Sequence, residues 1–381
     1  MALRVPIPTT CLRTGYGSAR TETRNPVMGV RNSTAIRAVL KQKPKPKPKQ
    51  VEVNKPVWEE VERLERMFRE EKYGSGDNPS PSTGFSGSPV RVAYQGVRGS
   101  YCQEAATKAF ASSSNAIPCT RMEDAFEALE DKSAHRAIIA VENSIDGTID
   151  RNLDLLLRHK DVSIIGELII PVNHCLLAHP GASRAQIKRI VSHPQALDHC
   201  KTRLQLLDIE IVEVANAADA AQFLSENCVT DTAVIGSKIA AKEFGLQVLH
   251  ENFQDPVPNC NRFLQLGFRP SMPVNTTFCS GEWKTTVAFT LNNGVSDLFR
   301  ALSLFENRNV TVTKVEQRPN RSNPIRVMKN KTRDTGCFDY VFIVDLNGNV
   351  SDSGITSSLA RLEEISGFLR VLGSYTCGSI C

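Results

Sequence analysis

The feature that most constrains the fold is a long alternation of short apolar segments with amphipathic ones, between Val90 and about Phe268. The apolar segments have the length and composition of strands, and each is followed by a turn or by helical spacing: VRVAYQG, RAIIAVE, RIVS, IEIVEV and TAVIGS. Such alternation predicts an α/β domain with a largely parallel sheet. Ligands of these sheets bind beyond the carboxyl ends of the strands, so we expect the functional residues there.

The pattern changes after about Gly281. Four further segments have strand character, TTVAFTL, VTVTKVEQR, FDYVFIVDL and LRVLGSY, and residues 297–307 and 357–368 have helical spacing. Their order is strand, helix, strand, strand, helix, strand, which is the ferredoxin-like pattern. We therefore expect a larger α/β domain over residues 90–270 and a smaller α+β domain over residues 281–381.

The N-terminal segment differs sharply in charge from the rest of the chain. Residues 1–50 hold eleven Lys or Arg and one acid, whereas residues 51–381 hold 35 basic and 40 acidic side chains. The first 40 residues are also rich in Ser and Thr, which is the composition of an organelle transit peptide, and we expect a plastid ahead of a mitochondrion. A basic tail without a targeting role is the alternative. Because the body is mildly acidic, the basic overall charge does not indicate nucleic-acid binding.

Two low-complexity segments separate this leader from the domains. KPKPKPK at residues 43–49 predicts an extended spacer, and residues 74–89 form a Gly/Ser/Pro linker. Between them, apolar side chains recur at helical spacing over residues 57–68 and predict one short helix within the segment 51–89. No apolar stretch reaches the roughly 18 residues of a membrane-spanning helix. The eleven cysteines are scattered without zinc-like spacing, so no metal site is expected.

Polar residues cluster directly after three predicted strands. These clusters are Asn143 with Ser144, Ser192 with His193 and Gln195, and Asn261 with Arg262. Helix N-termini at such turns bind carboxylates, and an arginine completes such a site with a bidentate contact. Each residue also has a structural alternative: a helix cap, a turn histidine, or the partner of a surface acid. QGVRGSY lacks the third glycine of a dinucleotide fingerprint, so nucleotide binding is weakly indicated.

A set of segments in a fixed order carries a family resemblance. RVAYQGVRGSY, VENS, PVNHCLLA, SHPQAL, NRFLQLG and FLRVLGSY together resemble the plant arogenate dehydratases and the wider prephenate dehydratase family, over residues 90–375. The resemblance implies a two-lobed α/β catalytic domain, similar to a type II periplasmic binding protein, joined to a ferredoxin-like ACT domain. It implies a carbon–oxygen lyase of phenylalanine biosynthesis that converts arogenate to phenylalanine, or prephenate to phenylpyruvate, with loss of CO2 and water.

The resemblance also implies partners and location. Members form homo-oligomers, here expected through the ACT domain, bind phenylalanine as an effector, use no metal or organic cofactor, and in plants lie in the chloroplast. No nucleic-acid or membrane partner is expected. Carried over residue by residue, the catalytic positions are Asn261, Asn143, Ser192 and His199, and the substrate-binding positions are Arg262, Ser144, Phe263 and Gln195. The phenylalanine-binding positions are Gly294, Glu316, Gln317 and Arg318.

This chain departs from the family pattern at chemically important places. Asn261 stands where the family has the threonine assigned to the leaving hydroxyl, and His199 stands where it has glutamine. Asp146 replaces a glycine, and a carboxylate there is expected to repel a dianionic substrate. Gln317 stands in the effector stretch where serine is usual. Two hypotheses therefore remain open: an active dehydratase in which Asn261 or His199 replaces the donor, or an impaired paralogue that regulates active subunits.

Overall fold

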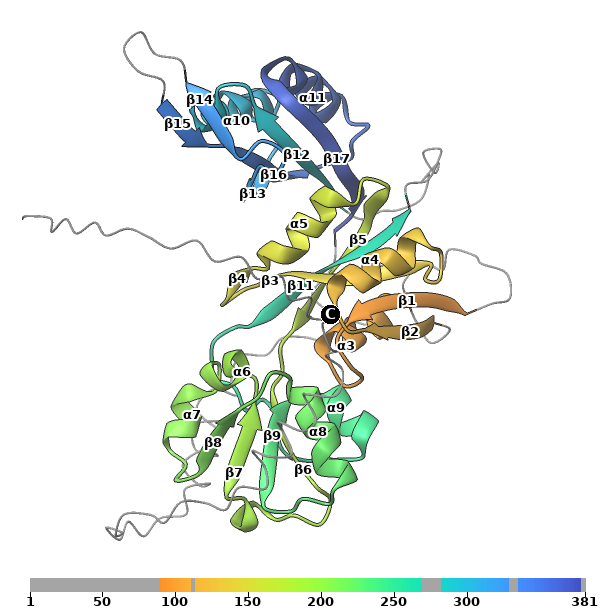
Figure 1. Ribbon diagram of the computed structural model, residues 1–381, viewed down its shortest axis with the longest axis vertical. Helices are drawn as coiled ribbons and strands as arrows, with labels where there is room; N and C mark the ends of the chain where they lie inside the picture. Colours follow the sequence, from red (N-terminus) through yellow and green to blue (C-terminus); the bar gives the residue numbers. More distant parts are fainter. Residues whose placement is uncertain (1–88, 111–113, 269–281, 329–334, 378–381) are drawn as a thin grey trace, which may run out of the picture.

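The computed structural model describes residues 89–110, 114–268, 282–328 and 335–377. These residues form three sheet-based units that follow one another along the long axis of the molecule (Figure 1). Two are lobes built from residues 90–268, and the third is the smaller C-terminal domain. The expected spacer at residues 43–49 and the expected helix at residues 57–68 lie outside the described residues, as does the linker up to residue 88.

The first lobe is a mixed sheet covered by three helices. Its strands lie in the order β5-β11-β3-β1-β2, with β1 parallel to β2 and β3. The strand β11 runs antiparallel to both of its neighbours, so the sheet is less uniformly parallel than the sequence predicts. Its elements are β1 (Val90–Gln95), α3 (Tyr101–Ala109), β2 (Ser114–Cys119), α4 (Met122–Glu130), β3 (Arg136–Asn143), β4 (Gly147–Thr148), α5 (Asp150–Arg158), β5 (Val162–Pro171) and β11 (Cys260–Phe268).

The second lobe is inserted between β5 and β11, so the chain crosses between the lobes twice. Its sheet has the order β10-β6-β9-β7-β8, with apolar clusters packed around Leu224 and around Phe253. This arrangement confirms the expected two-lobed α/β fold. Its elements are β6 (Cys175–Ala178), η1 (Arg184–Gln186), β7 (Arg189–Ser192), α6 (Pro194–Asp198), α7 (Lys201–Gln205), β8 (Glu210–Glu213), α8 (Ala217–Glu226), β9 (Thr232–Gly236), α9 (Lys238–Phe244) and β10 (Gln247–His250).

The C-terminal domain has the expected ferredoxin-like order. Its sheet runs β13-β16-β12-β17, and both helices pack on one face around Phe289 and Phe305. Two antiparallel strands that were not predicted from the sequence, β14 and β15, project from it. The elements are β12 (Trp283–Leu291), η2 (Gly294–Asp297), α10 (Leu298–Glu306), β13 (Val312–Pro319), β14 (Ile325–Met328), β15 (Thr335–Phe338), β16 (Tyr340–Asn347), α11 (Ser353–Ile365) and β17 (Ser366–Thr376).

The small domain is joined to the first lobe through its last strand. β17 pairs with β5 at Gly373 and Ile164, which makes one continuous sheet of the two units. A Cβ at Gly373 would lie 2.2 Å from the Ile164 carbonyl oxygen, so only glycine allows this approach.

One predicted helix boundary was wrong, because the last helix spans Ser353–Ile365 and not residues 357–368. The N-cap residue of α4 is Arg121, whose backbone amide donates to the Asp124 carboxylate at 2.9 Å. At the start of η1, the Ser183 amide donates to the Gln186 side-chain oxygen at 2.9 Å, as in a capping box. Within the described residues, no helix is long and apolar enough to cross a membrane.

Candidate functional site

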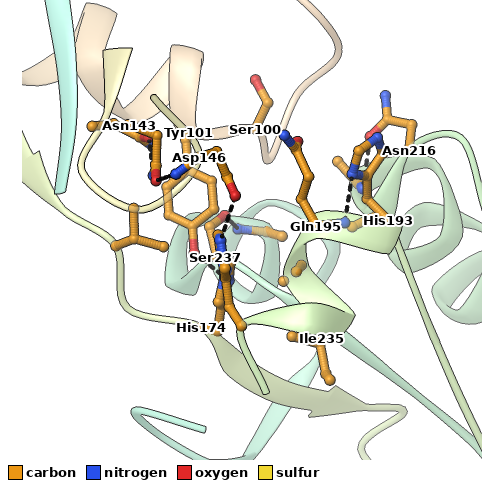
Figure 2. Close-up of a pocket in the computed structure, with 18 of the residues that line it drawn as sticks. Ser100, Tyr101, Asn143, Asp146, His174, His193, Gln195, Asn216, Ile235 and Ser237 are labelled. Atoms are coloured by element: carbon orange, nitrogen blue, oxygen red, sulfur yellow. Dashed lines mark hydrogen bonds and ion pairs between the residues drawn. The ribbon is translucent and has the colours of Figure 1, made fainter. Parts of the chain in front are cut away.

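A cavity of about 320 Å³ lies between the two lobes, where several strand ends meet helix N-termini (Figure 2). The first lobe contributes the start of α3 and the turn after β3, and the second contributes the starts of α6, α8 and α9. Its polar lining side chains are Ser100, Tyr101, Asn143, Asp146, Thr148, His174, His193, Gln195, His199, Asn216, Ser237 and Asn261.

The helices α3, of nine residues, and α8, of ten residues, present their N-termini to this cavity. Ser100 caps α3 by accepting a hydrogen bond from the Gln103 amide, and Asn216 caps α8 through the Ala218 amide. Gly99 has φ +80°, and a Cβ there would lie 2.9 Å from Phe244, so this turn requires glycine. The Ser237 hydroxyl donates to the Gly99 carbonyl at 2.6 Å and joins the lobes beside the cavity. The helix dipoles therefore give this wall a positive potential without a charged side chain.

Three asparagine side chains form an amide cluster at the cavity. The Asn143 amide nitrogen donates to the side-chain oxygens of Asn259 at 2.7 Å and of Asn261 at 2.9 Å. The Asn143 oxygen accepts from the backbone amides of Ile145 and Asp146, which closes the turn after β3. Because Asn143 and Asn261 are paired across β3 and β11, the ladder itself sets their positions.

A row of hydrogen-bonded side chains forms another wall of the cavity. The Tyr101 hydroxyl lies 2.9 Å from His174 Nδ1, and His174 Nε2 lies 3.2 Å from His199 Nδ1. His199 Nε2 lies 3.2 Å from the Asp146 carboxylate, and the two imidazoles stack with centroids 5.5 Å apart. Figure 2 shows Asp146 close to Tyr101 and Asn143 at the cavity. The row crosses from the first lobe to the second, because Asp146 follows β3 and His199 ends α6.

The charge of the cavity is low for a site expected to bind dianions. Among the described residues that line it, none is Lys or Arg, and Asp146 is the single carboxylate. Burial, with a further contribution from His199, lowers the pKa of His174 to about 3, so this imidazole is neutral at physiological pH. Burial raises the pKa of Tyr101 well above its usual range, so its phenol keeps its proton.

Four of the predicted catalytic and substrate-binding residues line the cavity: Asn143, Gln195, His199 and Asn261. The other four, Ser144, Ser192, Phe263 and Arg262, do not. Ser144 exchanges hydrogen bonds with the backbone of Pro258 and Cys260, and the buried Ser192 hydroxyl donates to the Ile235 carbonyl at 2.7 Å. Phe263 packs in the core of the first lobe. These three side chains hold the surrounding backbone in place.

Arg262 lies on the other face of β11, outside the cavity. Its guanidinium is 2.6 Å from the Glu167 carboxylate and 2.8 Å from Asp345 of the small domain, and Lys284 also contacts Glu167. Burial alone would lower the pKa of this guanidinium, but the neighbouring carboxylates of Asp345 and Glu167 raise it. The arrangement therefore offers an ion-pair cluster between domains, and not the expected bidentate contact of Arg262 with a ligand.

The predicted effector residues divide into two groups. Glu316 accepts a hydrogen bond from Thr148 at 2.7 Å, and Arg318 pairs with Asp150 and Asp154, so both face the first lobe. Gln317 points away from that contact and is exposed. Gly294, with φ +63°, begins the turn η2 beside Arg326. Thr148 also lines the cavity. Glu316 is therefore linked to the cavity through the Thr148 side chain.

Several site residues were missed or misjudged from sequence. Asp146 was expected only to repel the substrate, and its contact with His199 was not predicted. No function was predicted for Tyr101, His174 or Asn259, although Tyr101 and His174 lie within segments that carry the family resemblance and Asn259 lies two residues before one. Within the described parts of the chain, no group of three or more His, Cys, Asp or Glu side chains is placed to hold a metal ion.

Comparison with known proteins identifies relatives of the whole folded region. A family model described as prephenate dehydratase matches residues 92–271. An Arabidopsis thaliana protein named chloroplastic arogenate dehydratase/prephenate dehydratase 6 is 42% identical over 301 residues, which cover 78% of this chain and 71% of that protein.

Two solved structures resemble the chain at similar levels. A prephenate dehydratase from Arthrobacter aurescens, solved in complex with L-Phe, has a TM-score of 0.64 at 28% identity, covering 75% of this chain and 90% of that chain. A protein described as a novel type of quorum quenching acylase has a TM-score of 0.65 at 26% identity, covering 76% and 98%.

Proposed function

Because the chain belongs to the prephenate dehydratase family, we propose that the interlobe cavity is an active site in which arogenate or prephenate loses water and CO2. The observation that carries the proposal is the convergence of the Asn143, Asn261 and His199 side chains on one cavity of about 320 Å³. This volume is near the lower end of the range for small-molecule sites and suits a single substituted ring.

The reaction makes modest demands on the protein. A non-aromatic ring becomes aromatic when its hydroxyl leaves and a carboxylate departs as CO2, so the site must orient the ring, assist the leaving oxygen and desolvate the carboxylate. The substrate carboxylates are held by the backbone amides at the starts of α3 and α8, which face the cavity. Gln195 adds a neutral donor at the same opening.

The leaving hydroxyl is placed at Asn261. The side-chain oxygen of Asn261 already accepts a hydrogen bond from Asn143, so the N–H groups of Asn261 are the part left to meet a ligand. An amide positions and polarises the leaving oxygen but does not give up a proton. Asn143 is fixed in turn by two backbone amides and by Asn259, which makes the donor preorganised.

The acylase activity named for one structural neighbour is not proposed for this chain. Amide hydrolysis through an acyl-enzyme needs a nucleophile beside a base. The two serines that line the cavity are engaged elsewhere: the Ser100 hydroxyl accepts from the Gln103 amide, and the Ser237 hydroxyl donates to the Gly99 carbonyl. The impaired-paralogue hypothesis is also not favoured, because the plant relative at 42% identity is named as a dehydratase.

We extend the proposal to regulation and assembly through the small domain. Large apolar side chains on this domain are exposed, with Phe299 at 83% and Phe338 at 73%, and would be covered in a homo-oligomer. L-phenylalanine is the effector, by similarity to the bacterial relative solved with it. Since Glu316 and Arg318 contact the first lobe, an effector that used them would first release those contacts. Sedimentation analysis with and without L-phenylalanine tests both points, and a monomer unaffected by it contradicts them.

The protein is placed in the chloroplast. Its plant relative is named chloroplastic, and residues 1–50 carry the basic, acid-poor composition of a transit peptide. The full chain can be incubated with isolated plastids and then treated with protease. We expect it to be imported and therefore protected from the protease. A chain that remains outside contradicts it.

Turnover is the experiment that tests the catalytic proposal. The purified full-length chain is incubated separately with arogenate and with prephenate, and phenylalanine and phenylpyruvate are measured against a heat-inactivated sample. We expect product from at least one substrate. No product from either one rejects the proposed function.

A further inference from the structure

In the row formed by Tyr101, His174, His199 and Asp146, all hydrogen bonds run in one direction. The neighbouring Asn259 amide determines which atoms donate and which accept. The Asn259 oxygen accepts from Asn143, so the Asn259 amide nitrogen is the atom that faces His199 Nδ1, at 3.1 Å. His199 Nδ1 is then an acceptor, and the proton of the neutral ring lies on Nε2, which faces Asp146 at 3.2 Å. By the same logic His174 donates from Nε2 and accepts at Nδ1 from the Tyr101 hydroxyl.

Every donor in the row therefore points toward the Asp146 carboxylate, which lines the cavity together with the other three members. Chains of aligned hydrogen bonds in a poorly solvated place reinforce one another. His199 is well covered, with 7% of its side chain exposed, whereas Asp146 is 29% exposed. The aligned hydrogen bonds therefore end on Asp146, which is the one carboxylate among the described residues that line the cavity.

Proton exchange in this row is confined to its last two members. Tyr101 keeps its proton and His174 stays neutral, because burial shifts both groups away from titration near neutral pH. The other charged groups near His199 are accounted for. The Asp255 carboxylate accepts from the backbone amides of Thr202 and Arg203, and burial raises the pKa of the adjacent Cys200 thiol, which stays protonated. His193 is engaged at the start of α6.

We propose that the Asp146–His199 pair is the proton donor to the leaving hydroxyl, in the role that Asn261 cannot fill. The inference rests on the proposed dehydratase function. In the reacting state His199 takes a second proton at Nδ1 and is the imidazolium, and the Asn259 and His174 N–H groups turn away from Nδ1. Asp146 is the carboxylate that holds the ring at Nε2. As the C–O bond of the ring breaks, the leaving oxygen takes the Nε2 proton and departs as water. The electrons of the bond to the departing CO2 enter the ring, and His199 regains a proton from solvent.

The three departures from the family pattern at this site support one account. Asn261, His199 and Asp146 each replace a different residue type, and the structure brings all three to one cavity, with His199 and Asp146 in contact. An imidazolium gives up a proton far more readily than an amide or an alcohol hydroxyl, so a histidine is the best proton donor of the three residue types. The carboxylate that the sequence analysis expected to be repulsive is neutralised by its partner.

The pH dependence of arogenate turnover by the full-length chain tests the pair. An acid must be protonated to act, so kcat of the wild type is expected to fall as pH rises through the apparent pKa of the pair. His199→Gln is expected to lower kcat about a hundredfold and to abolish this alkaline fall. Asp146→Asn removes the charge that stabilises the imidazolium, so the fall moves to lower pH by about one unit.

The matched control is His159→Gln. His159 also pairs with a carboxylate, Glu130 at 2.6 Å, but on the outer surface of the first lobe, and its change leaves the profile as in the wild type. Thermal unfolding of each variant shows whether it is folded. If His199→Gln does not fold, Asp146→Asn decides the question.

The possible failures are distinguishable. Turnover in which both cavity variants retain the wild-type profile overturns the inference and leaves the dehydratase function standing. A chain that turns over neither arogenate nor prephenate at any pH rejects the function and this inference together.

Discussion

The two faces of β11 show how one strand serves two different purposes. Asn261 and Arg262 are chain neighbours, and strand geometry turns them to opposite sides. Asn261 faces a cavity with neutral donors and one carboxylate, whereas Arg262 faces the buried acids Glu167 and Asp345. The difference teaches that the fixed positive charge of this motif lies at the domain junction, while the proposed chemistry uses amides, imidazoles and helix ends.

The largest effect is expected on the Arg262 side. Arg262→Met removes the cation shared by Glu167 and Asp345 and leaves their carboxylates close together and poorly compensated. Breaking such a buried pair costs about 3–5 kcal/mol, which urea unfolding measures. The matched control is Arg361→Met, which breaks an exposed pair with Glu364 and is expected to cost about 0.5 kcal/mol. Unchanged stability with lost substrate binding would restore the direct role of Arg262.

The next effect is on the cavity side and concerns rate. Asn261→Ala removes the amide held by Asn143 and is expected to lower kcat about a hundredfold, as loss of one preorganised donor does. Asn261→Thr keeps a donor and should retain most of the activity. Steady-state kinetics with arogenate measures both. Equal losses in the two variants, or a loss of stability as large as that of Arg262→Met, would break the contrast between the faces.

A smaller, pH-dependent effect is expected at the contact between α5 and β13. Burial alone would raise the pKa of Asp154, but hydrogen bonds from Arg318 and Arg321 outweigh it and lower the pKa. A lowered folded-state pKa contributes stability above the unfolded value near 3.9, and this contribution is lost as pH falls through the folded pKa. Asp154→Asn should therefore be about 2 kcal/mol less stable than wild type at pH 7, with the gap closing below about pH 4.

Urea unfolding at several pH values checks this prediction. Glu364→Gln, at an exposed pair on the small domain, is the control with little expected pH dependence. A gap between wild type and Asp154→Asn that is constant from pH 7 to pH 3 would contradict the contribution of these ion pairs.

The smallest effect is expected at Ser144. Its hydroxyl accepts from the Cys260 amide at 2.9 Å and holds the turn after β3 against the start of β11. Ser144→Ala should cost about 1 kcal/mol of unfolding free energy and leave KM for arogenate within about twofold. A large rise in KM at unchanged stability would instead show that Ser144 binds substrate.

Local sequence patterns predicted much of the fold because they report burial directly. The alternation of strands and helices and the βαββαβ order were confirmed, since both follow from periodicity within short segments. The antiparallel insertion of β11 was not predictable in this way. The chain enters β11 after its second crossover, from the other lobe, and this crossover sets the direction of the strand. Local sequence patterns contain no information about such a long-range connection.

Part of the candidate site was predictable because the ends of strands can be recognised from local sequence patterns. Asn143 and Asn261 lie at strand ends, where clefts form, and both reach the cavity. The position of Arg262 could have been anticipated, because two adjacent strand residues cannot face one cleft. The contact of Asp146 with His199 could not, since they are 53 residues apart in different lobes and meet only in the folded chain.

Phenylalanine formation from arogenate by the wild type and by Asn143→Ala, measured side by side at equal folded concentration, tests the central claim most directly. Asn143 positions Asn261, Asn259 and the turn that carries Asp146, so it supports the amide donor and one member of the proposed proton-donating pair. We predict steady turnover by the wild type and a loss of at least about a hundredfold in the folded variant. Equal turnover by the two proteins would contradict the placement of the active site in this cavity.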